Sequence, residues 1–466
     1  MIAAAALLIA AGCSAPESSA PPRTLRVDYV HTGNATTERF ALDRLVREGE
    51  WPGPMDKRID SIGYGKYFFE VRDAASGEVW YSRGFASIFG EWELTAEAKE
   101  KSETFQESVR FPVPAAPVRL VLKKRDARNA YEEVWSVEVD PGEAKDWAIP
   151  AGVSFWSVME NGPPAEKVDL LLIGDGYAKG DLDKWHDDAR RLAEQLFTVS
   201  PFKERSTDFN VWAIDVASPR SGVPRPSDGV KGGSALGTTY DAMGSERYVL
   251  TFENERWRDV AATAPYEYVE IIVNNRKYGG GGIFNLYATV AADNAFTPYI
   301  FVHEFGHHFA GLADEYYTSE VAYESTEKRV EPWEPNATAD PCAAKWAGLI
   351  SPGVPLPTPW PKAEFEAYER TTQAERRRIR REQLPEEVME ELFRKERAWT
   401  TKTLSSHEYA GKVGAFEGAM YAARGYYRPE SDCIMFTRDE VGFCAVCRRA
   451  IGRVIDLYAA AASKPD

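Results

Sequence analysis

Histidine and cysteine are scarce in this sequence, which has only six and five of them among 466 residues. Long apolar runs are also missing: beyond the first residues no stretch could cross a bilayer, and we find no internal repeat. The net charge of −16 argues against nucleic acid as a partner, because phosphate binding needs clustered Lys and Arg. The rest of the composition is that of a folded protein, and the length favours two domains.

Residues 1–23 have the composition of an export signal followed by a tether. They begin MIAAAALLIAAGCSAPESSAPP, a short apolar run ending in small residues before a cysteine. Residues 9–13 resemble a bacterial lipobox, in which Cys13 would be lipidated. This predicts an exported protein, on the cell surface, at the outer membrane or in the periplasm, that touches a membrane only through a lipid anchor at Cys13. An ordinary secretory signal with a chance cysteine is the alternative.

Residues 24–155 are predicted to form an N-terminal β-sandwich domain. Short runs rich in β-branched and aromatic residues alternate there with turn residues, and no convincing helix interrupts them. The runs are YFFEVRDA (67–74), VWYSRGF (79–85), FQESVRF (105–111), VRLVLKK (118–124) and YEEVWSVEV (131–139). His31 stands alone in this region, so we interpret it as structural.

Residues 160–466 change in character and predict an α/β domain. VDLLLIG (168–174) is apolar apart from Asp169, as a strand buried on both faces would be. A helical pattern at 181–197 and strands at 209–218 and 266–275 follow, which indicates a parallel or mixed sheet. The whole chain is therefore expected to be an α+β multi-domain protein.

The segment TPYIFVHEFGHHFAG, residues 297–311, predicts a helix. Thr297 is placed to cap it, Pro298 suits its first turn, and Gly311 suits its end. Three of the six histidines of the chain lie on this one helix.

Within it, His303 and His307 are four residues apart and project from one face, where two imidazoles can bind one Zn²⁺. Glu304 lies beside them in an H-E-x-x-H pattern and can reach a water at the metal. His308 is turned about 100° from His307 on a helix, so we expect it to miss the metal.

A catalytic zinc usually has three protein ligands. In metzincin peptidases the corresponding helix ends at a glycine, and the third ligand follows three residues later. Counted from Gly311, that position is Asp314, whose carboxylate is an accepted zinc donor, and Glu315 is the rival.

HEFGHHFAGLADEYY (303–317) resembles the active-site segment of the IgA-peptidase family of zinc metallopeptidases, which is metzincin-like. The similarity extends to VDLLLIGDGY (168–177), SPRSGV (218–223), GGSALGTTY (232–240), VGAFEGAMYAARGYYRPESDCIMF (413–436) and FCAVC (443–447). It implies a β domain ahead of a metzincin-like α/β zinc peptidase domain. By the same analogy Met435 would be the Met-turn residue beneath the zinc.

The resemblance implies a zinc metalloendopeptidase that hydrolyses protein or peptide substrates. Zinc would activate a water, and Glu304 would act as general base and then acid. The glycine-rich stretch 279–294 could form an edge strand that aligns an extended substrate. A non-catalytic surface lipoprotein that binds protein or glycan is the main alternative, and a cell-wall peptide amidase is a further one.

Four cysteines remain besides Cys13, namely Cys342, Cys433, Cys444 and Cys447. An even number in an exported chain favours disulfides, whose pairing the sequence leaves open. C-x-M followed by C-x-x-C also resembles the archaemetzincins, in which four cysteines bind a second, structural zinc. Finally, the charged stretch 363–398, interrupted at Pro385, predicts a helical hairpin insertion, with a lid over the cleft as an alternative role.

Overall fold

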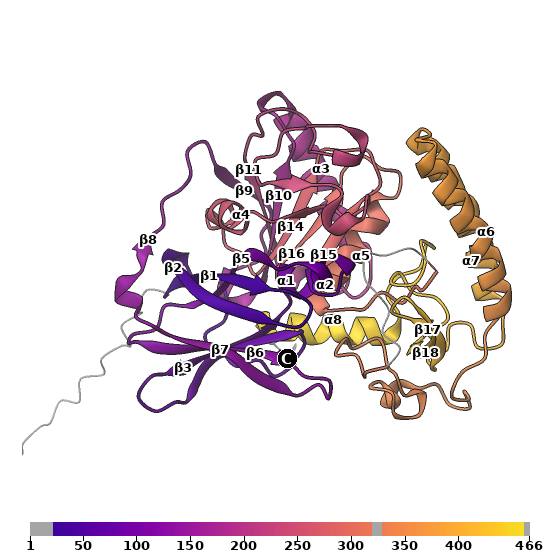
Figure 1. The fold of residues 1–466 in the computed structure, drawn as a ribbon, viewed down its shortest axis with the longest axis horizontal. Coiled ribbons are helices and arrows are strands. Elements are labelled where there is room, and N and C mark those ends of the chain that lie inside the picture. Colours follow the sequence, from indigo (N-terminus) through magenta and orange to yellow (C-terminus); the bar gives the residue numbers. More distant parts are fainter. Residues whose placement is uncertain (1–21, 319–328, 461–466) are drawn as a thin grey trace, which may run out of the picture.

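The computed structural model describes residues 22–318 and 329–460. The predicted signal segment and Cys13 lie outside these ranges. None of the helices within them is both long and apolar enough to span a membrane. Figure 1 shows a β-rich N-terminal part packed beside a mixed α/β part, with one long helical hairpin at the far side.

The N-terminal part consists of two four-stranded sheets. One has the order β5 (Glu103–Pro112), β1 (Arg23–Gly33), β2 (Glu38–Glu50), β8 (Lys145–Asp146), and the other β4 (Val79–Phe85), β3 (Tyr67–Asp73), β6 (Val118–Arg125), β7 (Tyr131–Val139). Leu25 and Val27 of the first sheet and Val71 and Leu120 of the second share one buried core. Two short helices, α1 (Ile88–Trp92) and α2 (Ala96–Glu100), were not expected from the sequence.

The second part is built on a six-stranded mixed sheet with the order β15 (Gly280–Ile283), β16 (Tyr287–Ala291), β14 (Tyr268–Val273), β10 (Val168–Asp175), β11 (Phe209–Asp215), β9 (Ser154–Met159). The four central strands are parallel, and β15 and β9 pair antiparallel at the two edges. Every residue of β10 is buried, as its largely apolar run predicts. The smaller pairs are β12 (Thr238–Thr239) with β13 (Leu250–Thr251) and β17 (Phe416–Ala419) with β18 (Ala422–Arg428).

The helix α5 (Thr297–Ala310) lies against β15 and β16 and also contacts α3 (Leu182–Leu196) and α8 (Ala445–Tyr458). His186 on α3 forms contacts rather than only facing solvent. Its Nε2 lies 2.9 Å from an Asp215 carboxylate oxygen, and its ring packs against Trp156.

The charged insertion forms the expected helical hairpin. α6 (Lys362–Arg381) and α7 (Glu386–Ser405) are joined by four residues, and Pro385 precedes the first turn of α7. The rings of Tyr368 and Trp399 stack between the two helices at 4.0 Å. Figure 1 shows the hairpin on the opposite side of the molecule from the β-sandwich.

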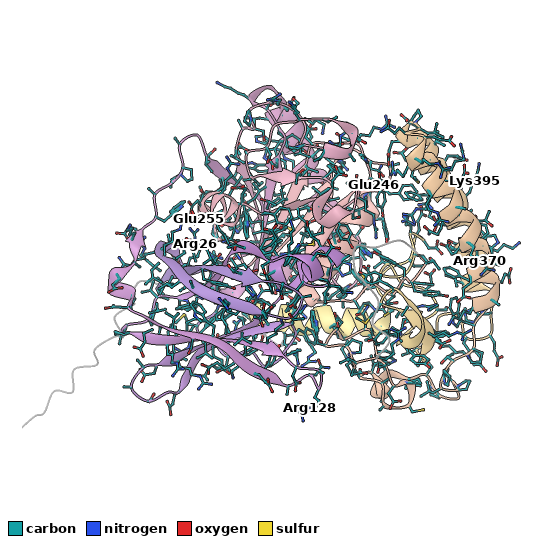
Figure 2. The ribbon with its side chains drawn as sticks, in the orientation of Figure 1. Arg26, Arg128, Glu246, Glu255, Arg370 and Lys395 are labelled. Atoms are coloured by element: carbon teal, nitrogen blue, oxygen red, sulfur yellow. The ribbon has the colours of Figure 1, made fainter. Side chains whose placement is uncertain are left out.

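The two parts are joined by polar contacts that are buried or half-buried. Arg26 of β1 is fully buried and donates to Asp259 of α4 (Asn254–Ala261) at 2.5 Å, and Glu255, labelled with Arg26 in Figure 2, stands on that same helix. Elsewhere the Ala86 N–H donates to the Phe284 carbonyl at 2.9 Å, directly after β15. The sandwich is thus attached to the strand that borders the histidine helix.

Candidate metal centre and cleft

The helix that carries the histidines begins and ends close to where the sequence predicts, but its cap differs. Phe296 is the N-cap residue, and its N–H donates to the Asn294 side chain at 2.9 Å. Thr297, predicted as the cap, instead donates its hydroxyl to the Ala291 carbonyl of β16. Gly311 ends the helix in the left-handed conformation, with φ of 57°, as expected.

His303, His307 and Asp314 come together at one point. The two Nε2 atoms are 3.2 Å apart, and each lies 3.1 Å from Asp314 Oδ1. The histidine pair follows from the helix itself, since residues four apart share a face. Asp314 is brought there by the turn at Gly311, and Glu315, the rival, points elsewhere.

The other ring nitrogens fix how the two imidazoles face this point. Nδ1–H of His303 donates to the Ile434 carbonyl at 2.9 Å, and Nδ1–H of His307 donates to the Leu312 carbonyl at 2.5 Å. With Nδ1 as the donor, each ring directs its Nε2 toward Asp314 Oδ1, and a neutral ring presents a lone pair there. Lone pairs and a carboxylate at such distances repel unless a proton or a cation lies between them, so this donor set fits a cation.

Asp314 is held by a residue that the sequence did not single out. Its second oxygen, Oδ2, accepts a hydrogen bond from the Tyr421 hydroxyl. Met420 and Tyr421 have φ of 50° and 60°, a left-handed conformation that is uncommon for residues other than glycine. The turn between β17 and β18 is thus strained where it supports Asp314, and strain of this kind gathers at functional sites. Tyr421 belongs to no recognisable spacing pattern, so the sequence alone does not indicate that it contacts Asp314.

Glu304 lies beside the histidines, as the H-E-x-x-H pattern predicts. One carboxylate oxygen and the ring nitrogens of His303 and His307 lie within 4.8 Å of one another. Burial raises the pKa of Glu304 above its usual value, partly offset by His303 and His307. A carboxylate with a raised pKa, in a cleft and next to a metal-binding cluster, is suited to accept and return a proton.

A cleft of about 680 Å³ opens over this cluster. Glu304, His307 and Asp314 line it together with the glycines of β15 and with Lys66 of the β-sandwich. On the side of the hairpin, Phe365 and Glu369 of α6 and Thr400 of α7 border a smaller cavity that His303 and Glu304 also line. The insertion therefore lies beside the site, and its role as a lid stays a prediction.

β15 is an edge strand, as its sequence suggested, but its outer edge is open only in part. Gly280 bonds to the backbone of the neighbouring loop, its N–H to Arg247 and its carbonyl to Val249. Four residues along, the Phe284 carbonyl accepts a hydrogen bond from the Ala86 N–H of the β-sandwich part. An extended chain could therefore pair with this edge only between these two points.

The glycines of β15 are explained by the helix beside them. A Cβ atom on Gly282 would lie 2.2 Å from the Glu304 carbonyl oxygen, and one on Gly280 would lie 3.1 Å from the Glu304 Cγ. Real Cβ atoms essentially never approach backbone as closely as the first distance. Gly280 and Gly282 are thus required for α5 to lie close to the strand, whereas Gly281 faces Leu250.

Met435 and His308 support the helix from within. Met435 is fully buried, and its sulfur lies where a Cβ on Gly306 would contact it, so it packs against α5. His308 accepts a hydrogen bond from the Val269 N–H at its Nε2, and its Nδ1–H donates to the Ile283 carbonyl, which ties α5 to the sheet. His308 thus faces away from the cluster, as its helical position predicts.

The four cysteines do not share one site. Cys342 is exposed, whereas Cys433, Cys444 and Cys447 are buried, and all four are free thiols. The three buried sulfurs gather around Glu315 instead, with all four ligand atoms within 4.8 Å of one another. Neither a disulfide nor a four-cysteine group is therefore present among the residues that the structure covers.

The fold is a mixed α+β one, and its cleft holds two histidines, an aspartate and a glutamate suited to hydrolysis. These features define a hydrolase with a candidate metal centre. Comparison with known families agrees: the family model described as IgA Peptidase M64 matches residues 157–455, and the one described as Peptidase M64 N-terminus matches residues 17–136. The chain belongs to the IgA peptidase M64 family and is a peptidase. No curated protein matches it.

Proposed function

We propose that this peptidase is an exported zinc endopeptidase that cleaves extracellular proteins. His303, His307 and Asp314 would hold the zinc, and Glu304 would be the general base and acid. The observation that carries the proposal is the triangle of two Nε2 atoms and one carboxylate oxygen with sides of 3.1 to 3.2 Å.

The triangle has the size that zinc requires. Zn–N and Zn–O bonds of about 2.0–2.1 Å in tetrahedral geometry separate the ligand atoms by about 3.3 Å. Three protein ligands leave a fourth position open, which distinguishes catalytic from structural zinc sites. The cleft above the triangle gives a substrate access to that position.

Zinc at this site would supply a Lewis acid that polarises the peptide carbonyl and lowers the pKa of water to about 7. Glu304 then takes a proton from the attacking water and delivers it to the leaving amine. Tyr421 keeps Asp314 oriented, and the Ile434 carbonyl keeps His303 in the tautomer that presents Nε2.

Substrate would bind as an extended chain that pairs with the short open part of β15. Main-chain hydrogen bonds to a sheet edge form largely independently of the sequence of the substrate. The family is named after immunoglobulin A, but we do not propose this substrate for the chain. No feature of the cleft, among the residues that the structure describes, selects an antibody hinge. We further propose that the protein is a lipoprotein anchored through Cys13, at the cell surface, the outer membrane or in the periplasm.

The test compares the purified protein with its Glu304→Ala variant on a diverse peptide mixture read by mass spectrometry. Cuts should be made only by the parent, abolished by a chelator and restored by zinc. Glu194→Ala, which removes an exposed glutamate of α3, is the matched control and should cut like the parent.

If parent and variant each bind zinc and both leave the peptides intact, the protein is a binder and the proposal fails. Peptidoglycan digested by the parent, with proteins and peptides untouched, would show an amidase instead.

A further inference from the structure

A second group of metal-ligating side chains lies behind the first, at the N-terminus of α8. Cys444 is the N-cap residue of this helix, Cys447 lies in its first turn, and Cys433 comes from the loop that carries Met435. The fourth member is Glu315, the residue directly after Asp314. The exposed fraction of each is between 0 and 3%.

The distances between these side chains are those of a tetrahedral site. Cys433 Sγ lies 3.9 Å from Cys447 Sγ, and Cys447 Sγ lies 3.5 Å from Glu315 Oε1. Zn–S bonds of about 2.3 Å and a Zn–O bond of about 2.0 Å predict separations of about 3.8 Å between sulfurs and about 3.5 Å between sulfur and oxygen.

Two of the three sulfurs accept backbone hydrogen bonds, which would stabilise thiolates at a metal. The Cys444 N–H donates to Cys433 Sγ at 3.3 Å, and the Cys447 N–H donates to Cys444 Sγ at 3.4 Å. The positive end of the α8 dipole also favours negative sulfur. Arg428 is fully buried nearby, and its charge acts on both Glu315 and Cys433.

A disulfide explains this arrangement less well than a bound metal ion does. Any bond among three cysteines leaves one buried thiol over, and the observed 3.9 Å is far from the ~2.05 Å of a disulfide. A disulfide would also give Glu315 no partner among the sulfurs, and Arg428 would be left as its positively charged neighbour. Oε1 of Glu315 accepts from Asn336 at 2.9 Å, but Oε2 is buried without a hydrogen-bond partner in the described part of the chain. A cation among the four ligands explains the carboxylate and all three sulfurs together.

We propose that Cys433, Cys444, Cys447 and Glu315 bind a second, structural zinc ion with no open position. This site differs from the four-cysteine arrangement, because Glu315 takes the place that Cys342 would have had. Four protein ligands, none of them exposed, are the mark of a structural zinc.

The second zinc would also position the first site. Glu315 is covalently next to Asp314, and Cys433 is next to Ile434, whose carbonyl orients His303. The Glu315 N–H donates to the Met435 carbonyl at 2.8 Å, so a direct hydrogen bond links these two segments. This positioning role rests on the proposed function, whereas metal binding by the four side chains does not.

The experiment measures zinc per chain by mass spectrometry on the purified protein and counts free thiols after denaturation without reductant. We expect two zinc ions in the parent, and one in the His303→Ala, Asp314→Ala double variant. Cys447→Ser should lose the other zinc and unfold at a lower temperature, and Cys342→Ser, the matched control, should keep both.

Cobalt substitution and Glu315 variants make the test specific to this ligand set. Cobalt in the double variant should give sulfur-to-metal charge-transfer absorption. Glu315→Gln preserves shape and should release the second metal to a chelator at least tenfold faster, whereas Glu315→Cys should retain it.

Two results would overturn the second site. The first is a single zinc in the parent that the His303, Asp314 double variant lacks entirely. The second is a thiol count that shows two of the three buried cysteines to be oxidised. Neither result bears on whether the parent cleaves peptides, so this proposal and the peptidase proposal fail separately.

Discussion

Asp314 and Glu315 are neighbours in the chain, yet their carboxylates belong to different clusters. Asp314 Oδ1 lies 3.1 Å from the Nε2 atoms of His303 and His307, and Glu315 Oε1 lies 3.5 Å from Cys447 Sγ. The chain is pinned on both sides here: the Met420 N–H donates to the Asp314 carbonyl, and the Glu315 N–H donates to the Met435 carbonyl. One dipeptide thus connects the cleft with the buried cysteines.

Removing the Tyr421 hydroxyl should weaken zinc binding without removing a ligand. Tyr421→Phe deletes the hydrogen bond to Asp314 Oδ2, and losing an outer partner of a metal ligand typically costs roughly 10- to 100-fold in affinity. Competition with a chromogenic chelator measures the change. Tyr427→Phe on β18, the strand that follows this turn, is the control, and equal effects of the two variants would contradict the role of Tyr421.

Zinc binding should release a proton at neutral pH. Burial lowers the pKa of His307, but the Asp314 carboxylate outweighs this and raises it to about 9 in the metal-free protein. His307 is therefore protonated below that pH, and zinc must displace the proton. The apparent affinity should rise roughly tenfold per pH unit between about 7 and 9, then level off, and acid should release the metal. Calorimetry in buffers of different ionisation enthalpy measures the proton; an affinity independent of pH would rule out this ligand set.

Gly282→Ala should disturb the helix that carries the histidines. Its Cβ would lie 2.2 Å from the Glu304 carbonyl oxygen and 2.9 Å from the His307 Cβ, so strand and helix must move apart. Overpacking of this kind typically costs ~1–3 kcal/mol. Gly281→Ala is the control, because its Cβ would meet only the end of the Leu250 side chain, at 3.0 Å. In chemical denaturation, Gly282→Ala should be less stable than Gly281→Ala, and it should also bind less zinc.

In the Glu270→Gln variant, the free energy of unfolding should fall less steeply with rising pH than it does in the parent. Glu270 of β14 is fully buried, and both its carboxyl oxygens lack a hydrogen-bond partner in the ranges that the structure covers. Burial, and then the charge of Glu304, raise its pKa well above 4.5, so the folded protein keeps a proton that the unfolded chain loses.

Stability must then fall as pH rises above about 4.5, by up to about 1.4 kcal/mol per pH unit, until the folded pKa is reached. The glutamine variant should lose less stability than the parent over this range in urea unfolding experiments. Parallel curves for the two proteins would show that Glu270 does not carry the effect.

Much of the cleft could be predicted from local sequence. The four-residue spacing of His303 and His307 fixes their common face on any helix, and Gly311 marks the end of that helix. Thr297 is not the cap that the sequence predicts, because a hydroxyl at a helix start can equally bond to a neighbouring strand, here at Ala291. The role of Tyr421 could not be predicted from local sequence, because Tyr421 contacts Asp314, which lies 107 residues earlier in the chain.

The sequence by itself determined the histidine helix, Glu304 beside the histidines and the β-rich part ahead of it, since these depend on periodicity over a few residues. Only the tertiary structure decided which acidic residue joins the histidines and which joins the cysteines. Residues 312–317 lie in neither a helix nor a strand, and the carboxylates of Asp314 and Glu315 point to different sides. Which side faces which cluster is decided by distant partners, Met420 and Met435, that no local pattern specifies.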